Sequence, residues 1–136
     1  MTNTVLVDTN VILDVLTDDP AWADWAIGQL ERLAPSARLL IDPIIYAELA
    51  VGFTAPDELD AVLAQMAFDY EEVPRSALFL AAAAFRRYRA GGGVKTSPLP
   101  DFFIGAHAQA AGYALLTRDA ARYRTYFPQV ELILPG

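Results

Sequence analysis

The chain has 136 residues, of which 54% are hydrophobic and 20% are charged, and its formal net charge is −7. This length and composition predict a single folded domain over residues 1–136 with a sizeable core, and they exclude a disordered chain. The absence of cysteine excludes disulfides and thiolate zinc sites. Because no apolar run reaches membrane length and no N-terminal signal pattern is present, we expect a soluble protein in the reducing cytoplasm.

The charge is unevenly distributed along the chain. Residues 1–75 contain 14 acidic and 3 basic residues, a net charge of −11, whereas residues 76–136 contain 3 acidic and 7 basic residues, a net charge of +4. Such asymmetry is a hint of a polyanionic partner, although a solvated basic face explains it equally well. The overall acidity therefore does not exclude nucleic acid.

Short apolar runs alternate with segments of helical spacing. Strands are predicted over 5–7, 39–41, 68–73, 113–116 and 130–134. Helices are predicted over 10–17, 20–33, 44–52, 56–66, 76–89, 101–111 and 120–126. This alternation predicts an α/β fold in which a parallel sheet carries helices on both faces.

Four acids fall where such a fold forms binding sites. Asp8 and Asp119 follow predicted strands, Asp101 opens a helix, and Glu48 lies in a helix with apolar neighbours nearly all round. These positions share the carboxyl edge of a parallel sheet, so the side chains can converge there. Clustered carboxylates are costly unless they bind a cation or have raised pKa values. All-oxygen ligation suits Mg²⁺ or Mn²⁺, and the single histidine weighs against zinc.

Each polar residue also has a structural interpretation. Asp8, Asp101 and Asp119 could each cap a helix. Asn10 and Thr117 could be turn residues, or they could orient Asp8 and Asp119. His107, the only histidine, is explained by a packed or a surface helix position.

Four motifs contain the four acids together with Asn10 and Thr117: Val-Asp-Thr-Asn at 7–10, Ile-Tyr-Ala-Glu-Leu-Ala-Val-Gly at 45–52, Pro-Asp-Phe-Phe-Ile-Gly-Ala at 100–106 and Leu-Leu-Thr-Arg-Asp at 115–119. Together they resemble the PIN-domain ribonucleases, and most closely the VapC toxins of VapBC toxin–antitoxin pairs. The resemblance covers essentially the whole chain and implies a parallel sheet of about five strands between helices.

The resemblance also implies roles for individual residues. The catalytic, metal-binding acids of the family fall on Asp8, Glu48, Asp101 and Asp119, and its supporting polar positions fall on Asn10 and Thr117. Many relatives carry another acid shortly after the last motif, where this chain has Ala120 and Ala121. That departure leaves the number of metal ions, one or two, open.

A PIN-domain toxin is expected to be a Mg²⁺- or Mn²⁺-dependent endoribonuclease, leaving 5′-phosphate and 3′-hydroxyl ends. The resemblance further implies a cognate antitoxin, a homodimer, and contact with operator DNA only through the antitoxin. Trp22 and Trp25 could contribute to the antitoxin contact, or they could belong to a core stripe. We expect five basic residues to contact the RNA backbone: Arg86, Arg87, Arg89, Lys95 and Arg118. Arg122 and Arg124 could instead lie on a solvent face.

Three rival classes are weighed against this interpretation. A haloacid-dehalogenase-type phosphatase needs a second Asp where this chain has Asn10, and it normally also uses a lysine, of which Lys95 is the only one. A phosphoacceptor receiver domain needs a pair of acids near the first strand and a late lysine. A non-catalytic PIN-like interaction module would be expected to lack the acids, yet all four are present.

Overall fold

The computed structural model describes residues 3–136 and contains one five-stranded sheet with the order β3-β2-β1-β4-β5. All neighbouring strands pair in parallel. The strands are β1 (Asn3–Val7), β2 (Ala37–Ile41), β3 (Asp69–Tyr70), β4 (Ala114–Leu116) and β5 (Leu132–Ile133). The predicted parallel α/β sheet of five strands is confirmed.

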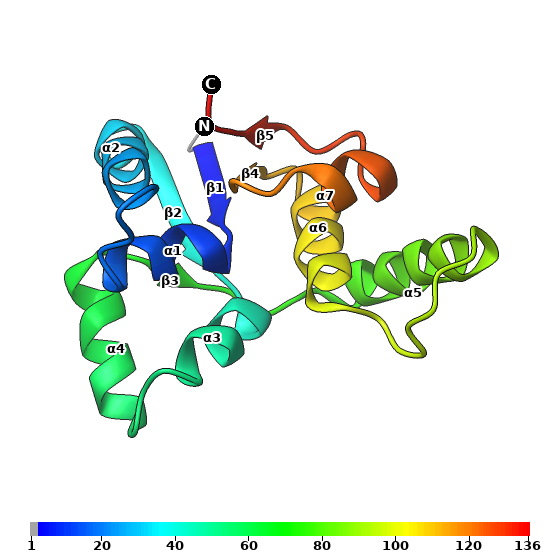
Figure 1. Cartoon of the computed structure of the whole chain (residues 1–136), viewed down its shortest axis with the longest axis horizontal. Helices are drawn as coiled ribbons and strands as arrows, with labels where there is room; N and C mark the ends of the chain where they lie inside the picture. Colours follow the sequence, from blue (N-terminus) through cyan, green and yellow to red (C-terminus); the bar gives the residue numbers. More distant parts are fainter. Residues whose placement is uncertain (1–2) are drawn as a thin grey trace.

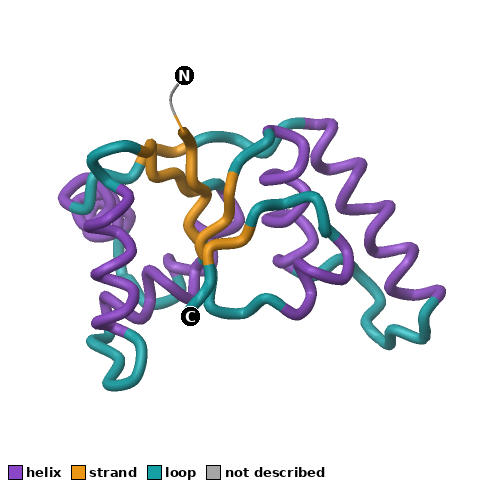
Figure 2. The backbone as a smooth tube through the Cα atoms, turned by 90° about the horizontal axis from the view of Figure 1, so that it is seen from above, coloured by secondary structure: helices purple, strands orange, loops and turns teal. Residues whose placement is uncertain are grey.

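Seven helices surround this sheet in the described part of the chain. They are α1 (Thr9–Leu16), α2 (Ala23–Leu33), α3 (Pro43–Ala50), α4 (Pro56–Gln65), α5 (Arg75–Ala90), α6 (Pro100–Ala111) and α7 (Ala121–Tyr126). Helices α1, α2 and α4 lie on one side of the central strands and α5, α6 and α7 on the other, while α3 contacts both α1 and α6 (Figure 1). From above, the strands form a layer between the two groups of helices (Figure 2). Between residues 3 and 136, no helix is both long enough and apolar enough to cross a membrane.

The core is built on β1 and its two neighbours. Leu6, Val7, Leu40 and Leu115 are fully buried, as expected for strands covered on both faces. The two edge strands are shorter than the apolar runs that predict them, since β3 and β5 contain two residues each. Each edge strand has only one neighbour, so its pairing ends earlier than its sequence pattern does.

Two helix ends illustrate how local chemistry sets the boundaries. The helix predicted from residue 20 begins at Ala23, because the Asp19 carboxylate accepts hydrogen bonds from the backbone N–H groups of Ala21 and Trp22, at 2.9 and 3.0 Å, and holds a turn. Helix α6 ends where predicted, at Gly112, whose φ of 73° is the left-handed conformation that glycine adopts readily.

Candidate active site

Asp8 lies at the centre of the site, directly after β1, and is only 5% exposed. Its Oδ1 accepts a hydrogen bond from the backbone N–H of Thr9 at 2.8 Å, so Asp8 itself caps α1. Its Oδ2 accepts hydrogen bonds from the hydroxyls of Thr117 at 2.8 Å and Tyr123 at 2.9 Å. The capping interpretation is therefore confirmed, but it accounts for only one of the two oxygens.

The buried position of Asp8 makes its negative charge costly. Burial raises the pKa of the Asp8 carboxyl from 3.8 to about 6, although the hydrogen bonds from Thr117 and Tyr123 lower it. The nearby Asp101 carboxylate raises the pKa further. A cation next to such a buried carboxyl group favours its charged form.

Tyr123 is a buried residue whose hydroxyl donates to Asp8. Its ring is 1% exposed, and burial raises the pKa of its hydroxyl well above the usual value. The negative charges of Asp8, Asp101 and Glu48 each raise it further. The Tyr123 hydroxyl thus donates to Asp8 and lies close enough to Asp101 and Glu48 for their charges to affect its pKa.

Asp101 has no capping role, so the capping interpretation of this residue is wrong. The N-cap of α6 is Leu99, and Asp101 lies in the first turn. Burial raises the pKa of the half-buried Asp101 carboxyl and the Asp119 charge adds to the rise, whereas Arg122 and the Tyr123 hydroxyl oppose it. The guanidinium Nη1 of Arg122 lies 3.7 Å from Oδ2 of Asp101.

Asp119 is the most open of the four acids. The N-cap of α7 is Ala120, without a side-chain cap, so the capping interpretation of Asp119 is also wrong. Its side chain is exposed, and its backbone N–H donates to Oγ1 of Thr117 at 3.1 Å. Asp119 and Asp101 line the same surface hollow.

Glu48 reaches the site from α3. It is half-buried, and its Oε1 accepts a hydrogen bond from the Thr9 hydroxyl at 2.7 Å. Because Thr9 also donates its backbone N–H to Asp8, one residue orients two of the acids.

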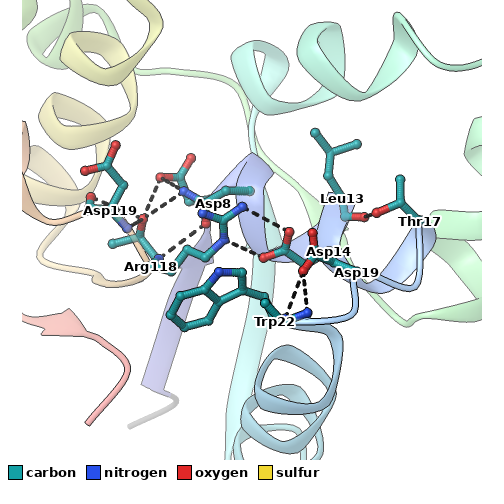
Figure 3. A network of polar contacts seen from close by, with 11 residues as sticks. Asp8, Leu13, Asp14, Thr17, Asp19, Trp22, Arg118 and Asp119 are labelled. Carbon is teal, nitrogen blue, oxygen red and sulfur yellow. Dashed lines mark hydrogen bonds and ion pairs between the residues drawn. The ribbon is translucent and has the colours of Figure 1, made fainter.

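The supporting residues connect the start of the chain to the turn after β4. The Asn10 amide donates to Oγ1 of Thr117 at 3.2 Å, and its Oδ1 accepts from the backbone N–H of Arg118 at 3.3 Å. The Arg118 guanidinium donates to both oxygens of the buried Asp14, at 2.6 and 3.1 Å, and lies 5.4 Å from the Trp22 ring centroid (Figure 3). Asn10 and Thr117 both donate to Oδ2 of Asp8, at 3.4 and 2.8 Å, contacts that are consistent with the supporting role expected of them.

The other arginines expected to contact RNA cluster at the end of α5. The Arg87 guanidinium donates to the backbone oxygen of Tyr126 at 2.9 Å, and that of Arg89 donates to the backbone oxygens of Gly93 and Lys95 at 3.1 and 3.0 Å. Arg86 lies over the Phe79 ring. The Arg89 contacts hold the loop that leads to α6, and the Arg87 contact joins α5 to α7. The expected RNA contacts stay a prediction.

His107 is fully buried in α6, and its partner is Asp42 and not one of the four acids. Its Nδ1 is 3.0 Å from Oδ2 of Asp42, whose other oxygen accepts from the backbone N–H groups of Ile44 and Ile45 and so caps α3. The packed position considered for His107 is confirmed.

Two residues of the site were missed by the sequence interpretation, Tyr123 and Arg122. Tyr123 could have been suspected, since a buried tyrosine hydroxyl requires a partner. Arg122 was considered a surface residue, and the apolar pattern of its short helix gives no sign that it faces Asp101.

The acids provide the oxygen donors that Mg²⁺ or Mn²⁺ prefers. Over residues 3–136, no three acidic or histidine side chains are already gathered closely enough to hold a metal ion. Burial raises the pKa values of Asp8 and Asp101, and the hydrogen bonds from Thr117 and Tyr123 to Asp8 come from uncharged hydroxyl donors. The residue types therefore fit a divalent cation.

The fold and the site together define an α/β domain with an acidic site at the carboxyl edge of a parallel sheet. The chain belongs to the PIN domain family, whose match spans residues 5–128. No curated protein sequence matches the chain.

Solved structures with the same fold cover nearly the whole chain. A VapBC2 complex from Rickettsia felis, bound to a promoter DNA fragment, has a TM-score of 0.76 and 19% identity over 98% of this chain and 99% of that chain. A DNA-bound VapBC from Salmonella typhimurium has a TM-score of 0.71 and 19% identity over 98% of both chains. A toxin–antitoxin complex from Klebsiella pneumoniae has a TM-score of 0.70 and 22% identity over 97% of this chain and 98% of that chain. At these identities the likeness concerns the fold.

Proposed function

We propose that this protein is a metal-dependent endoribonuclease that acts in the cytoplasm as the toxin of a toxin–antitoxin pair. The observation that carries the proposal is the buried Asp8 carboxylate at the end of β1, which shares the donor Thr9 with Glu48 and whose pKa is raised by burial and by the nearby Asp101. Capping explains neither Asp101 nor Asp119, and it uses only one oxygen of Asp8.

The residues that would hold Mg²⁺ or Mn²⁺ are Asp8, Glu48, Asp101 and Asp119. When bound, such an ion lowers the pKa of a coordinated water and neutralises charge that develops on the phosphate. The protein contributes a fixed geometry, since Thr117 and Tyr123 orient Asp8 and Thr9 orients Glu48.

The kind of donor that orients each acid decides whether its carboxylate can bind a cation. Asp8 is held by hydroxyl donors, which stabilise its charged form without carrying positive charge themselves. The carboxylate therefore stays available to a cation. By contrast, the buried carboxylate of Asp14 is neutralised by Arg118 and is not available as a ligand.

The proposed partners follow from the related complexes. VapBC and other toxin–antitoxin assemblies share this fold, two of them in DNA-bound form, so we infer a cognate antitoxin, a homodimer, and DNA contact through the antitoxin. Apolar side chains remain exposed on α5, where Phe79 is 71% exposed and Leu78 is 44% exposed. Exposed apolar surface of this kind is available for such a contact.

The test is cleavage of a mixed RNA pool with Mg²⁺ by the wild type and by the Asp8→Asn and Asp101→Asn variants. We expect both substitutions to abolish cleavage and growth inhibition while the circular dichroism spectrum is retained. Asp24→Asn, on the exposed face of α2, is the matched control and should cleave like the wild type. Undiminished cleavage by both site variants, or activity in a phosphatase assay instead, would refute the proposal.

A further inference from the structure

A hollow of about 330 Å³ opens beside the acids, between α5, α6 and α7. Asp101 and Asp119 form its acidic wall, and the remaining wall is formed mainly by Tyr88, Arg122 and Tyr126. Carboxylates, a guanidinium group and aromatic rings therefore line the same hollow. The network that orients Asp8 uses none of these last three residues.

Arg122 is held at the boundary between the two walls. Its Nη1 lies 3.7 Å from Oδ2 of Asp101, and its guanidinium carbon lies 5.8 and 5.6 Å from the ring centroids of Tyr88 and Phe102. Arg122 and Asp101 are each 35% exposed in their side chains, so the ion pair is worth little and can be exchanged for another anion. A guanidinium binds a phosphate through the same paired hydrogen bonds that it forms with a carboxylate.

The Tyr126 ring is fixed by its neighbours and is half-buried. It makes edge contacts with Phe102 at 5.3 Å and with Tyr88 at 6.4 Å between centroids. Tyr88 in turn stacks on Phe85. Because its neighbours already hold the Tyr126 ring in place, a planar group can pack against the ring with little loss of side-chain entropy.

We propose that this hollow binds one nucleotide of single-stranded RNA next to the phosphodiester bond at the acids, with its base on Tyr126 and its phosphate on Arg122. The proposal rests on the proposed ribonuclease function. Single strands are favoured because a base must be unstacked before it can contact an aromatic side chain, and duplex RNA keeps its bases stacked.

The test is equilibrium binding of short fluorescent oligoribonucleotides to the full chain in EDTA, where no cleavage is required. Arg122→Gln should weaken binding about tenfold and reduce the slope of log affinity against log salt by about 0.7, as expected for one lost phosphate contact with a single strand. Arg124→Gln removes the same charge from an exposed position on the same helix and should change neither quantity. Equal effects of the two substitutions would overturn the phosphate contact.

The base contact is tested by Tyr126→Leu, with Tyr126→Phe as its matched control. Loss of the ring should weaken binding at least about fivefold with an unchanged salt slope, whereas Phe should bind like the wild type. Wild-type affinity of the Leu variant, equal affinity for duplex RNA, or no binding of any single strand by the wild type would overturn the proposal. If Tyr126→Leu fails to fold, the Arg122→Gln comparison still decides the phosphate contact.

Cleavage assays separate this proposal from the function on which it rests. RNA binding that responds to both substitutions, in a protein that cleaves nothing, would support the subsite and refute the ribonuclease. Efficient cleavage with a KM that neither Arg122→Gln nor Tyr126→Leu alters would support the ribonuclease and refute the subsite.

Discussion

In the absence of divalent cations, the protein should lose stability as the pH rises through the range in which Asp8 ionises. The folded carboxyl has a pKa of about 6, against 3.8 for the ordinary value that we assign to the unfolded chain. Between these values the folded state holds a proton that the unfolded state has released, so the free energy of unfolding falls as the pH rises. Below about pH 3.8 the penalty is absent, and above about pH 6 it is complete.

The magnitude follows from the shift itself. Each pKa unit corresponds to about 1.4 kcal/mol, so the full penalty is about 3 kcal/mol. From about pH 5 to about pH 7.5, the free energy of unfolding should fall by about 1.4 kcal/mol through Asp8 alone. The raised pKa of Asp101 acts in the same direction.

Urea unfolding in EDTA, followed by tryptophan fluorescence at several pH values, measures this effect. Asp8→Asn removes the titrating group and should flatten the dependence, while Asp24→Asn should retain the wild-type slope. The net charge of −7 also grows more negative with pH, and this change affects the stability of every variant. The difference between the variants therefore isolates the contribution of Asp8. Equal slopes for the wild type and Asp8→Asn would refute the reasoning.

Added Mg²⁺ should raise the unfolding midpoint more at about pH 7.5 than at about pH 5, because a cation binds the deprotonated carboxylate; an equal rise would contradict the proposed ligands. Tyr123→Phe should weaken Mg²⁺ binding, measured by calorimetry, because Asp8 loses the hydroxyl donor that favours its charged form. Arg118→Met should destabilise the protein by about 3 kcal/mol in urea unfolding, since it leaves the buried Asp14 carboxylate unpaired; Arg118→Lys should lose less.

The sequence predicted the central part of the fold because its signals there are local and strong. The apolar runs that form β1 and β2 have no polar interruption, and Gly112 ends α6 as its residue type suggests. The edge strands were predicted too long, because their ends depend on the partner strand and not on their own residues. The start of α2 depends on a side-chain turn at Asp19, which competes with the helix expected from Pro20.

The placement of the four acids at one edge of the sheet could be predicted, because parallel topology brings strand ends together whatever the packing details. The rotation of a short helix such as α7 is different, since it is set by tertiary packing. The direction of Tyr123 toward Asp8 and of Arg122 toward Asp101 therefore could not be obtained from spacing. Capping was also ambiguous in the sequence, because Asp8, Asp101 and Asp119 all precede or open helices and only Asp8 caps one.

The hydrogen bonds around Asp8 have a consequence for the order in which the protein is made. Thr117 and Tyr123 lie 109 and 115 residues after Asp8, and Arg118 lies 104 residues after Asp14. Oδ1 of Asp8 therefore finds its donor, Thr9, in the next residue to be made, whereas the two hydroxyl donors to Oδ2 are made more than a hundred residues later. A product that stops before Thr117 retains the Thr9 contacts with Asp8 and Glu48 but lacks both hydroxyl donors to Oδ2 of Asp8. Synthesis thus delays the completion of the Asp8 network until the segment with Thr117 and Tyr123 has emerged.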